Sequence, residues 1–431
     1  MKRLLLLFAI LLVALPVMAQ DDMDPCDLEA PEMEAEVNFI GVAFPLIEFM
    51  GEELEKCNSV DNLTVNAQVL DSASSTEQVN LALAGGGDSP WALLHTDLSR
   101  IGELNEFDAL HPLTDLVEKY WDEYDLGDIP QTAWDAVTLE GDIYGVPFMQ
   151  NTFHIFYRSD LFEKWELDPP ATYDDVIDAC EVLKQEPSID LPFTMNLHAG
   201  WAWEIEFMHF LRAFGGYHLN DDNTPAFNSE EGVAALNKMK EVVDACMGAE
   251  GLTYSIDDSE IGMETGTLAF INIWASRAAN MDNPDKSNYV GIINFSPAPM
   301  PNPDTGILGG SAWIDALSLT KRSGVDHDLV FRVVMETVDK ASQAEGALHG
   351  PILRSSVIEE GGGGRYFQAM GTSVAQGVGS YSIRPAASLF RTILSNWLPL
   401  VGSGELTAEE ALQAAADEYT AEATTQGFIE G

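Results

Sequence analysis

Tryptophans occur at points where the chain should leave a strand or enter a helix, and such points often line small-molecule sites. Trp274 follows a predicted strand at 268–273, Trp313 follows a Gly-Gly turn, and Trp201 begins a predicted helix at 201–214. Indole faces pack well against flat, apolar faces of a ligand. The chemistry these residues suggest is therefore reversible binding.

Polar groups near the same points could complete such a site, although each candidate has an ordinary structural alternative. His95 and Asp97 end a predicted strand, but Asp97 could instead cap the next helix. Trp201 could simply pack in the core beside Trp203 and Phe207. Trp274 and Trp313 have the same core alternative, so the sequence leaves both roles open.

The elements that must position these residues alternate between strand and helix. Strands are predicted at 36–43, 63–71 and 91–94, with helices at 46–57 and 75–84. Such alternation favours a parallel sheet covered by helices on both faces. Ligands of these sheets bind beyond the carboxyl ends of the strands.

Later segments also contain predicted strands and helices, and turn or capping residues mark some of their ends. A hairpin is predicted over 137–147 and a strand over 153–157, and Thr172 is positioned to cap a helix. Further helices are predicted at 230–246 and 407–423. The length after the first 19 residues suits two large lobes or three small domains.

The charge balance excludes some partners. The chain has 70 acidic and 21 basic residues, for a formal charge of −49. Such a surface repels nucleic-acid phosphates and anionic lipid headgroups. The acidity is interpreted as a solvated surface, with an acidic cleft for a cationic ligand as the alternative.

The N-terminus has the pattern of an export signal. Lys2 and Arg3 precede an apolar run at 4–17, so residues 1–19 are predicted to be a cleaved signal peptide. Cys26 lies too far from that run to be a lipoprotein cysteine. The product is expected to be free in a periplasm, without membrane insertion.

Four cysteines in an oxidising compartment are expected to pair. Cys180 and Cys246 both lie on apolar faces of predicted helices, which favours a bridge between them. Cys26 and Cys57 would then tether the N-terminal arm. Buried, unpaired thiols remain the alternative.

Catalytic motifs are absent from the sequence. With 70 carboxylates a chance acidic pair is easy to find, but there is no nucleophile elbow, zinc-binding His-Glu-x-x-His or phosphate loop. The eight histidines show no metal-ligand spacing. No metal or cofactor is expected, and a secreted glycoside hydrolase is the weaker alternative to a binding protein.

Three spaced motifs, in order, carry a family resemblance. They are Glu140-Gly-Asp-Ile-Tyr-Gly-Val-Pro147, Phe156-Tyr-Arg-Ser-Asp-Leu-Phe162 and Pro169-Pro-Ala-Thr-Tyr-Asp-Asp175. Together they resemble the extracellular solute-binding protein family 1 of ABC importers. The matching stretches cover essentially the whole chain after the signal.

The resemblance implies an α/β fold of the two-lobed periplasmic binding protein type 2, with mainly parallel sheets and a ligand cleft between the lobes. Chain passages between the lobes are expected near Tyr144–Met149, Gly291–Ser296 and Pro351–Arg354. The predicted boundaries assign 20–147 and 296–352 to lobe 1, and 148–295 and 353–431 to lobe 2.

The resemblance also implies a set of ligand contacts. Trp274 matches a position that stacks on the ligand, and either Asn151 or its neighbour Gln150 should hydrogen-bond to it. Arg354 matches a basic residue of the hinge, with a salt bridge to a carboxylate as its alternative role.

The expected function is capture of a sugar or polyol by hinge closure, followed by delivery to a membrane permease. The protein is expected to act as a monomer and not as an enzyme. A polyamine or other cation is the alternative ligand, because tryptophans and carboxylates suit cations.

Overall fold

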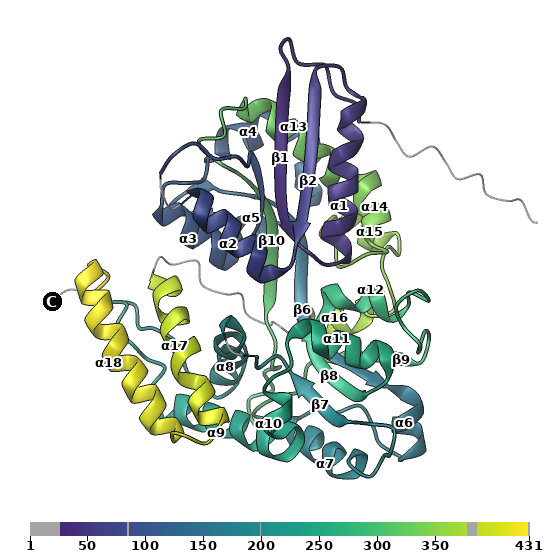
Figure 1. Ribbon diagram of the computed structural model, residues 1–431, viewed down its shortest axis with the longest axis vertical. Helices are drawn as coiled ribbons and strands as arrows, with labels where there is room; N and C mark the ends of the chain where they lie inside the picture. The colour runs from purple at the N-terminus through teal and green to yellow at the C-terminus, as the bar shows by residue number, and fades with distance from the viewer. Residues whose placement is uncertain (1–25, 84–85, 199, 377–385, 430–431) are drawn as a thin grey trace, which may run out of the picture.

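Two lobes are joined by a sheet that continues from one into the other (Figure 1). The computed structural model describes residues 26–83, 86–198, 200–376 and 386–429. The predicted signal peptide lies outside these residues. We call the lobe that contains β1 (Ala35–Val42) the first lobe and the lobe that contains β8 (Leu268–Trp274) the second lobe.

The main sheet has eight strands and is mixed. Its order is β2-β1-β3-β10-β6-β8-β7, and β9 pairs with β6. The outer pairs β1–β2, β1–β3 and β7–β8 are parallel, as expected, but every pair made by β6 or β10 is antiparallel. The remaining strands are β2 (Leu63–Leu70), β3 (Leu93–Asp97), β6 (Val146–Arg158), β7 (Leu191–Met195), β9 (Ile293–Pro297) and β10 (Ala312–Leu319), with the separate hairpin β4 (Thr138–Leu139) and β5 (Asp142–Ile143).

The antiparallel centre follows from the path of the chain. The first residues of β6 pair with β10 in the first lobe, and its last residues pair with β8 and β9 in the second. Strand β10 then runs back from the junction into the first lobe, where it pairs with β3. Because one strand leaves the first lobe and the other returns to it, they meet in opposite directions.

Helices flank the sheet in both lobes (Figure 1). Those of the first lobe are α1 (Pro45–Lys56), α2 (Ser72–Leu83), α3 (Leu98–Glu106), α4 (Thr114–Tyr120), α5 (Gln131–Ala136), α13 (His327–Val338), α14 (Lys340–Gly346) and α15 (Ser355–Glu359). Those of the second are α6 (Ser159–Lys164), α7 (Tyr173–Leu183), α8 (Trp201–Ala213), α9 (Glu230–Val242), α10 (Gly248–Gly251), α11 (Ile256–Thr265), α12 (Ala278–Met281), α16 (Phe367–Ala375), α17 (Ala386–Gly402) and α18 (Ala408–Gln426).

Local sequence signals account for the ends of several helices. Thr172 forms a capping box with Asp175 at the start of α7, and Thr407 forms one with Glu410 at the start of α18. In each box the hydroxyl accepts from a free backbone N–H and the carboxylate accepts from the capping residue. The predicted helix starts at these two residues are confirmed.

Both predicted disulfides are present. Cys180–Cys246 joins α7 to the turn of π-helix η3 (Val243–Met247) that extends α9, and Cys26–Cys57 ties the N-terminal arm to the end of α1. The structure describes no free cysteine, and the sequence contains only these four.

We propose that the return passage to the first lobe lies later than 291–296. Strand β9 pairs with β6 inside the second lobe, and the Gly310 carbonyl accepts a hydrogen bond from Arg212 of α8. Residues 298–310 therefore pack with the second lobe. These contacts favour a boundary near Ser311 in place of 295/296.

The third passage is displaced in the same direction. Arg354 donates to backbone carbonyls of the first lobe, and Ser356 donates to a first-lobe carboxylate. Arg365, in contrast, donates to acceptors on β9 in the second lobe. We therefore propose that the crossing lies at the glycine-rich 360–364, beyond the expected 351–354.

Within the described ranges, we find no helix long and apolar enough to cross a membrane.

Candidate functional site

A pocket of about 550 Å³ lies at the junction of the lobes. Its first-lobe wall comes from the carboxyl ends of β1 and β3, as expected from the strand–helix alternation, and from the start of α2 and α3. Its second-lobe wall comes from the start of α8, the end of β8, and α17. The polar and aromatic lining includes Ser72, Ser75, Thr76, His95, Asp97, Ser99, Arg100, Glu103, Asn151, Trp201, Trp274, Ser276, Arg277, Trp313, Asp315, Ser388, Arg391, Thr392, Ser395 and Asn396.

Most of the residues proposed from sequence meet here. His95, Asp97, Asn151, Trp201, Trp274 and Trp313 all line the pocket. Gln150 and Arg354 do not. Gln150 lies on β6 opposite Ile314 of β10. Because successive side chains of a strand point to opposite faces of the sheet, Gln150 and Asn151 face opposite sides.

Arg354 is a structural residue of the first lobe. Its side chain is buried and donates to the carbonyls of Tyr124, Asp125 and Val338. Asp128 lies 3.7 Å from its guanidinium. The structure therefore places Arg354 outside the pocket, with the alternative salt bridge to a carboxylate formed.

Two tryptophans form an aromatic corner in the pocket wall. The rings of Trp274 and Trp313 meet edge to face, with centroids 5.6 Å apart, and Phe153 supports Trp274 from behind at 4.0 Å. Both tryptophans are mostly buried. Since their remaining accessible surface borders the pocket, this corner offers an apolar face to a ligand.

Asn151 holds the turn that follows Trp274. Its Nδ2 donates to Ser276 Oγ at 3.0 Å, and its Oδ1 accepts from the Ser276 backbone N–H at 3.1 Å. The same oxygen accepts from the Thr152 N–H. The amide thus links β6 to the turn that follows β8.

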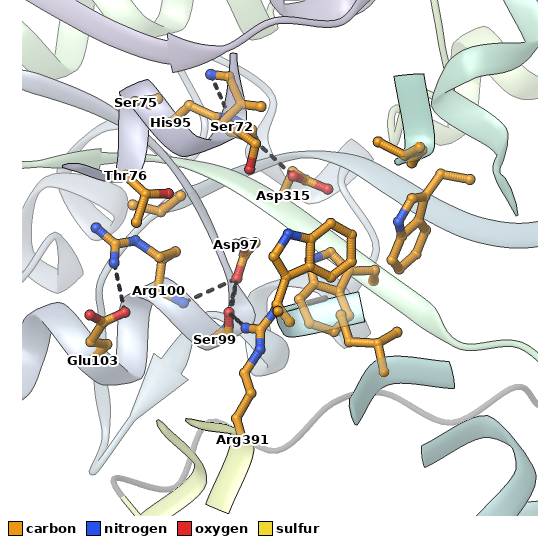
Figure 2. Close-up of a pocket in the computed structure, with 18 of the residues that line it drawn as sticks. Ser72, Ser75, Thr76, His95, Asp97, Ser99, Arg100, Glu103, Asp315 and Arg391 are labelled. Atoms are coloured by element: carbon orange, nitrogen blue, oxygen red, sulfur yellow. Dashed lines mark hydrogen bonds and ion pairs between the residues drawn. The ribbon is translucent and has the colours of Figure 1, made fainter. Parts of the chain in front are cut away.

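Asp97 is the N-cap of α3. Its Oδ1 accepts from the backbone N–H groups of Ser99 and Arg100 and from the Ser99 hydroxyl (Figure 2). These bonds satisfy free donors at the helix start. The capping alternative is therefore confirmed, in a residue that also borders the pocket.

Arg391 reaches across the pocket from the second lobe. It lies on α17 and donates to the Ser99 hydroxyl on α3, as Figure 2 shows. Its guanidinium carbon lies 6.0 Å from the ring centres of both Trp201 and Trp313. Arg391 therefore joins the two lobes at the edge of the aromatic corner.

Replacing Arg391 with glutamine should loosen the lobes in the absence of ligand. The lost hydrogen bond is partly exposed, so we expect its loss to destabilise the conformation in which the lobes are in contact by about 1 kcal/mol. The radius of gyration from X-ray scattering should rise. The control is Arg332→Gln, which breaks an ion pair with Asp328 within the first lobe. An increase for both variants, or for neither, would count against this role of Arg391.

His95 and Asp315 form a buried pair that sequence reasoning only half identified. His95 Nε2 lies 2.8 Å from Asp315 Oδ1, and His95 Nδ1 accepts from the Val42 backbone N–H at 3.4 Å. Burial raises the pKa of Asp315 to about 6, and the hydrogen bond from His95 offsets only part of that effect. An acidic residue inside the apolar run of β10, Ala312–Leu319, was the available signal.

The chain belongs to the bacterial extracellular solute-binding protein family, whose model matches residues 47–323. This family consists of binding proteins and not of enzymes.

Similar proteins cover different parts of the chain. An uncharacterised ABC transporter extracellular-binding protein of Pyrococcus horikoshii is 40% identical over 86 residues, 20% of each chain. The sn-glycerol-3-phosphate-binding periplasmic protein of Shigella dysenteriae is 24% identical over 221 residues, 48% of this chain and 49% of the relative. The chain thus spans half or less of these relatives' length.

Solved structures match over almost the whole chain. A solute-binding protein of Agrobacterium radiobacter in complex with ribitol superposes with a TM-score of 0.77 at 19% identity, covering 90% of this chain and 99% of that one. Maltose-bound MalE3 of T. maritima gives 0.77 at 19% identity, covering 89% and 99%. At this identity the likeness establishes the shared fold.

Proposed function

We propose that the protein is the ligand-capturing component of an ABC importer, that its ligand is a neutral sugar or polyol, and that the lobes close over it. The observation that carries this is the pocket itself. It lies between the lobes and combines an aromatic corner with hydroxyl and amide groups. Sugars present apolar C–H faces and a rim of hydroxyls, which need both kinds of partner.

Closure follows from the division of the pocket between the lobes. Trp274 belongs to the second lobe and His95 to the first, so a ligand can touch both only when the lobes approach each other. Ligand binding then shifts the population toward the closed form. We propose that a membrane permease recognises that form.

The charges of the pocket argue against a cationic ligand. Among the described residues, three arginines and three carboxylates line it, although the whole chain carries a formal charge of −49. The acidity therefore lies elsewhere on the molecule. A site for a polyamine would need an excess of carboxylates beside the aromatic rings.

The carboxylates also give little support to a hydrolase. Asp97 caps a helix, Glu103 forms an ion pair with Arg100, and Asp315 accepts from His95. A glycosidase needs two carboxyl groups aimed at one bond.

Export to a periplasm and action as a monomer are part of the same proposal. Two disulfides among four cysteines fit an oxidising compartment, and the predicted signal at 1–19 would direct the chain there.

The test is a melting-shift screen with ribitol, D-mannitol, D-tagatose, maltose and spermidine. We expect at least one neutral compound to raise the melting temperature, because a ligand at a hundredfold excess over its Kd adds about 2.7 kcal/mol of stability. Calorimetry then gives the Kd, and chromatography shows that the compound is returned unchanged. Stabilisation by spermidine alone, lost on adding salt, would favour the cationic ligand, and consumption of a compound would favour an enzyme.

A further inference from the structure

One carboxylate oxygen in the pocket wall has no hydrogen-bond partner among the described residues. Asp315 uses Oδ1 to accept from His95, whereas Oδ2 is buried and unpaired. The side chain is only 8% exposed. Because an unpaired buried acceptor is unfavourable, a donor supplied by a ligand would stabilise this position.

His95 fixes which oxygen remains available. Its Nδ1 accepts from the Val42 N–H, so the ring proton must lie on Nε2 and be donated to Asp315 Oδ1. The imidazole packs against Phe44 and Phe148, with ring centres 5.6 and 5.9 Å away. With its orientation held in this way, Asp315 keeps Oδ2 unpaired in the wall of the pocket.

We propose that Asp315 Oδ2 accepts a hydrogen bond from a hydroxyl of the bound ligand, and that binding thereby releases a proton from Asp315 to solvent. The inference rests on the proposed function and narrows the ligand to neutral compounds that place a hydroxyl donor at this oxygen. The ligand hydroxyl keeps its own hydrogen, and the proton released is the one that Asp315 carries in the free protein.

The residues on the neighbouring strands leave Asp315 as the group whose protonation changes when the ligand binds. It lies opposite Asp97 on β3 and opposite Met149 on β6, which is uncharged. Asp97 adds a like charge that also raises the pKa of Asp315. The other charged groups that the structure describes in the pocket have partners: Asp97 at the start of α3, Arg100 with Glu103, Arg277 with Glu260, and Arg391 with Ser99.

The expected consequence is an affinity that rises with pH. In the free protein the pKa of Asp315 is about 6, so much of it is protonated at pH 5. A donor on Oδ2 stabilises the charged form and lowers the pKa in the complex. If that lowering is about one unit, the Kd at pH 5 is about fivefold higher than at pH 7.5.

The experiment measures the Kd and proton release of the tightest neutral binder among ribitol, D-mannitol, D-tagatose and maltose. Titration at pH 6 in two buffers of different ionisation enthalpy counts released protons on the unmodified protein. Asp315→Asn should bind at least about tenfold more weakly, since its amide would turn a donor toward the ligand hydroxyl. The pH dependence should vanish with it. Asp285→Asn, which replaces an exposed residue, should change neither the Kd nor its pH dependence.

The possible results of this experiment distinguish failure of this inference from failure of the proposed function. A ligand that binds the wild-type protein with no proton release and equal affinity at pH 5 and pH 7.5 overturns the inference and leaves the function standing. Wild-type affinity in a folded Asp315→Asn variant overturns it as well. If the wild-type protein binds none of the four compounds, both fail.

Discussion

Replacing Cys180 and Cys246 with alanine is expected to lower the free energy of unfolding by about 4 kcal/mol. The bridge closes a loop of 66 residues, and both sulfur atoms are buried between α7 and η3. Closing so long a loop restricts the unfolded chain strongly, and its release favours unfolding. Urea unfolding, followed by circular dichroism, measures the loss.

The second disulfide supplies a matched control. Cys26–Cys57 closes a loop of only 31 residues. Because a shorter loop restricts the unfolded chain less, we expect the Cys26→Ala/Cys57→Ala variant to lose less. A larger loss there, or equal stability of the 180/246 variant and the wild type, would contradict the argument. Neither bridge lines the pocket, so ligand affinity should stay unchanged in both variants.

Much of the fold could be predicted because its signals are local. The Thr172 cap depends on residues three positions apart, and the hairpin at β4–β5 depends on a turn at Glu140–Gly141. The first two strands and the α-helix that follows each of them could be predicted from periodicity alone. Strand β3 was predicted two residues early, because its first observed residue, Leu93, lies inside a longer apolar run.

Pairing across the centre of the sheet could not be predicted in the same way. Strand β6 is a mostly buried strand of 13 residues, and its composition does not indicate that its two halves pair in different lobes. The later chain passages depend on contacts such as Arg212 with Gly310, which join segments 98 residues apart. A mainly parallel sheet was therefore a fair expectation from the strand–helix alternation, and the mixed centre required the structure.

The site shows the same limit at the level of single side chains. The sequence could select Asn151 as a polar group near a lobe passage, but its partner Ser276 lies 125 residues away. Arg354 had the right type and the right neighbourhood for a ligand contact, yet nearby carbonyl groups and Asp128 engage it within the first lobe. Arg391 gave no sequence signal, since nothing local indicates that α17 approaches α3.

Replacing Trp274 with alanine is expected to weaken binding of a sugar or polyol by about 1–3 kcal/mol, from burial of its ring face against the ligand. Each 1.4 kcal/mol corresponds to about a tenfold rise in Kd. The truncation also removes packing behind the corner, because Phe153 lies 4.0 Å and Trp313 5.6 Å from the indole. Trp274→Phe, which keeps an aromatic face, should lose less affinity and less stability. Calorimetry with the tightest neutral binder measures both variants.

The comparison that isolates the ligand contact uses another tryptophan of the second lobe. Trp165 is partly exposed, donates to Glu186 and does not line the pocket. Trp165→Ala should therefore cost stability without changing the Kd. If Trp274→Ala instead binds as tightly as the wild type, Trp274 only packs in the core, and the ligand face of the corner must come from Trp313. Equal losses of affinity in the Trp165 and Trp274 variants would show that altered lobe packing, and not a ring–ligand contact, weakens binding.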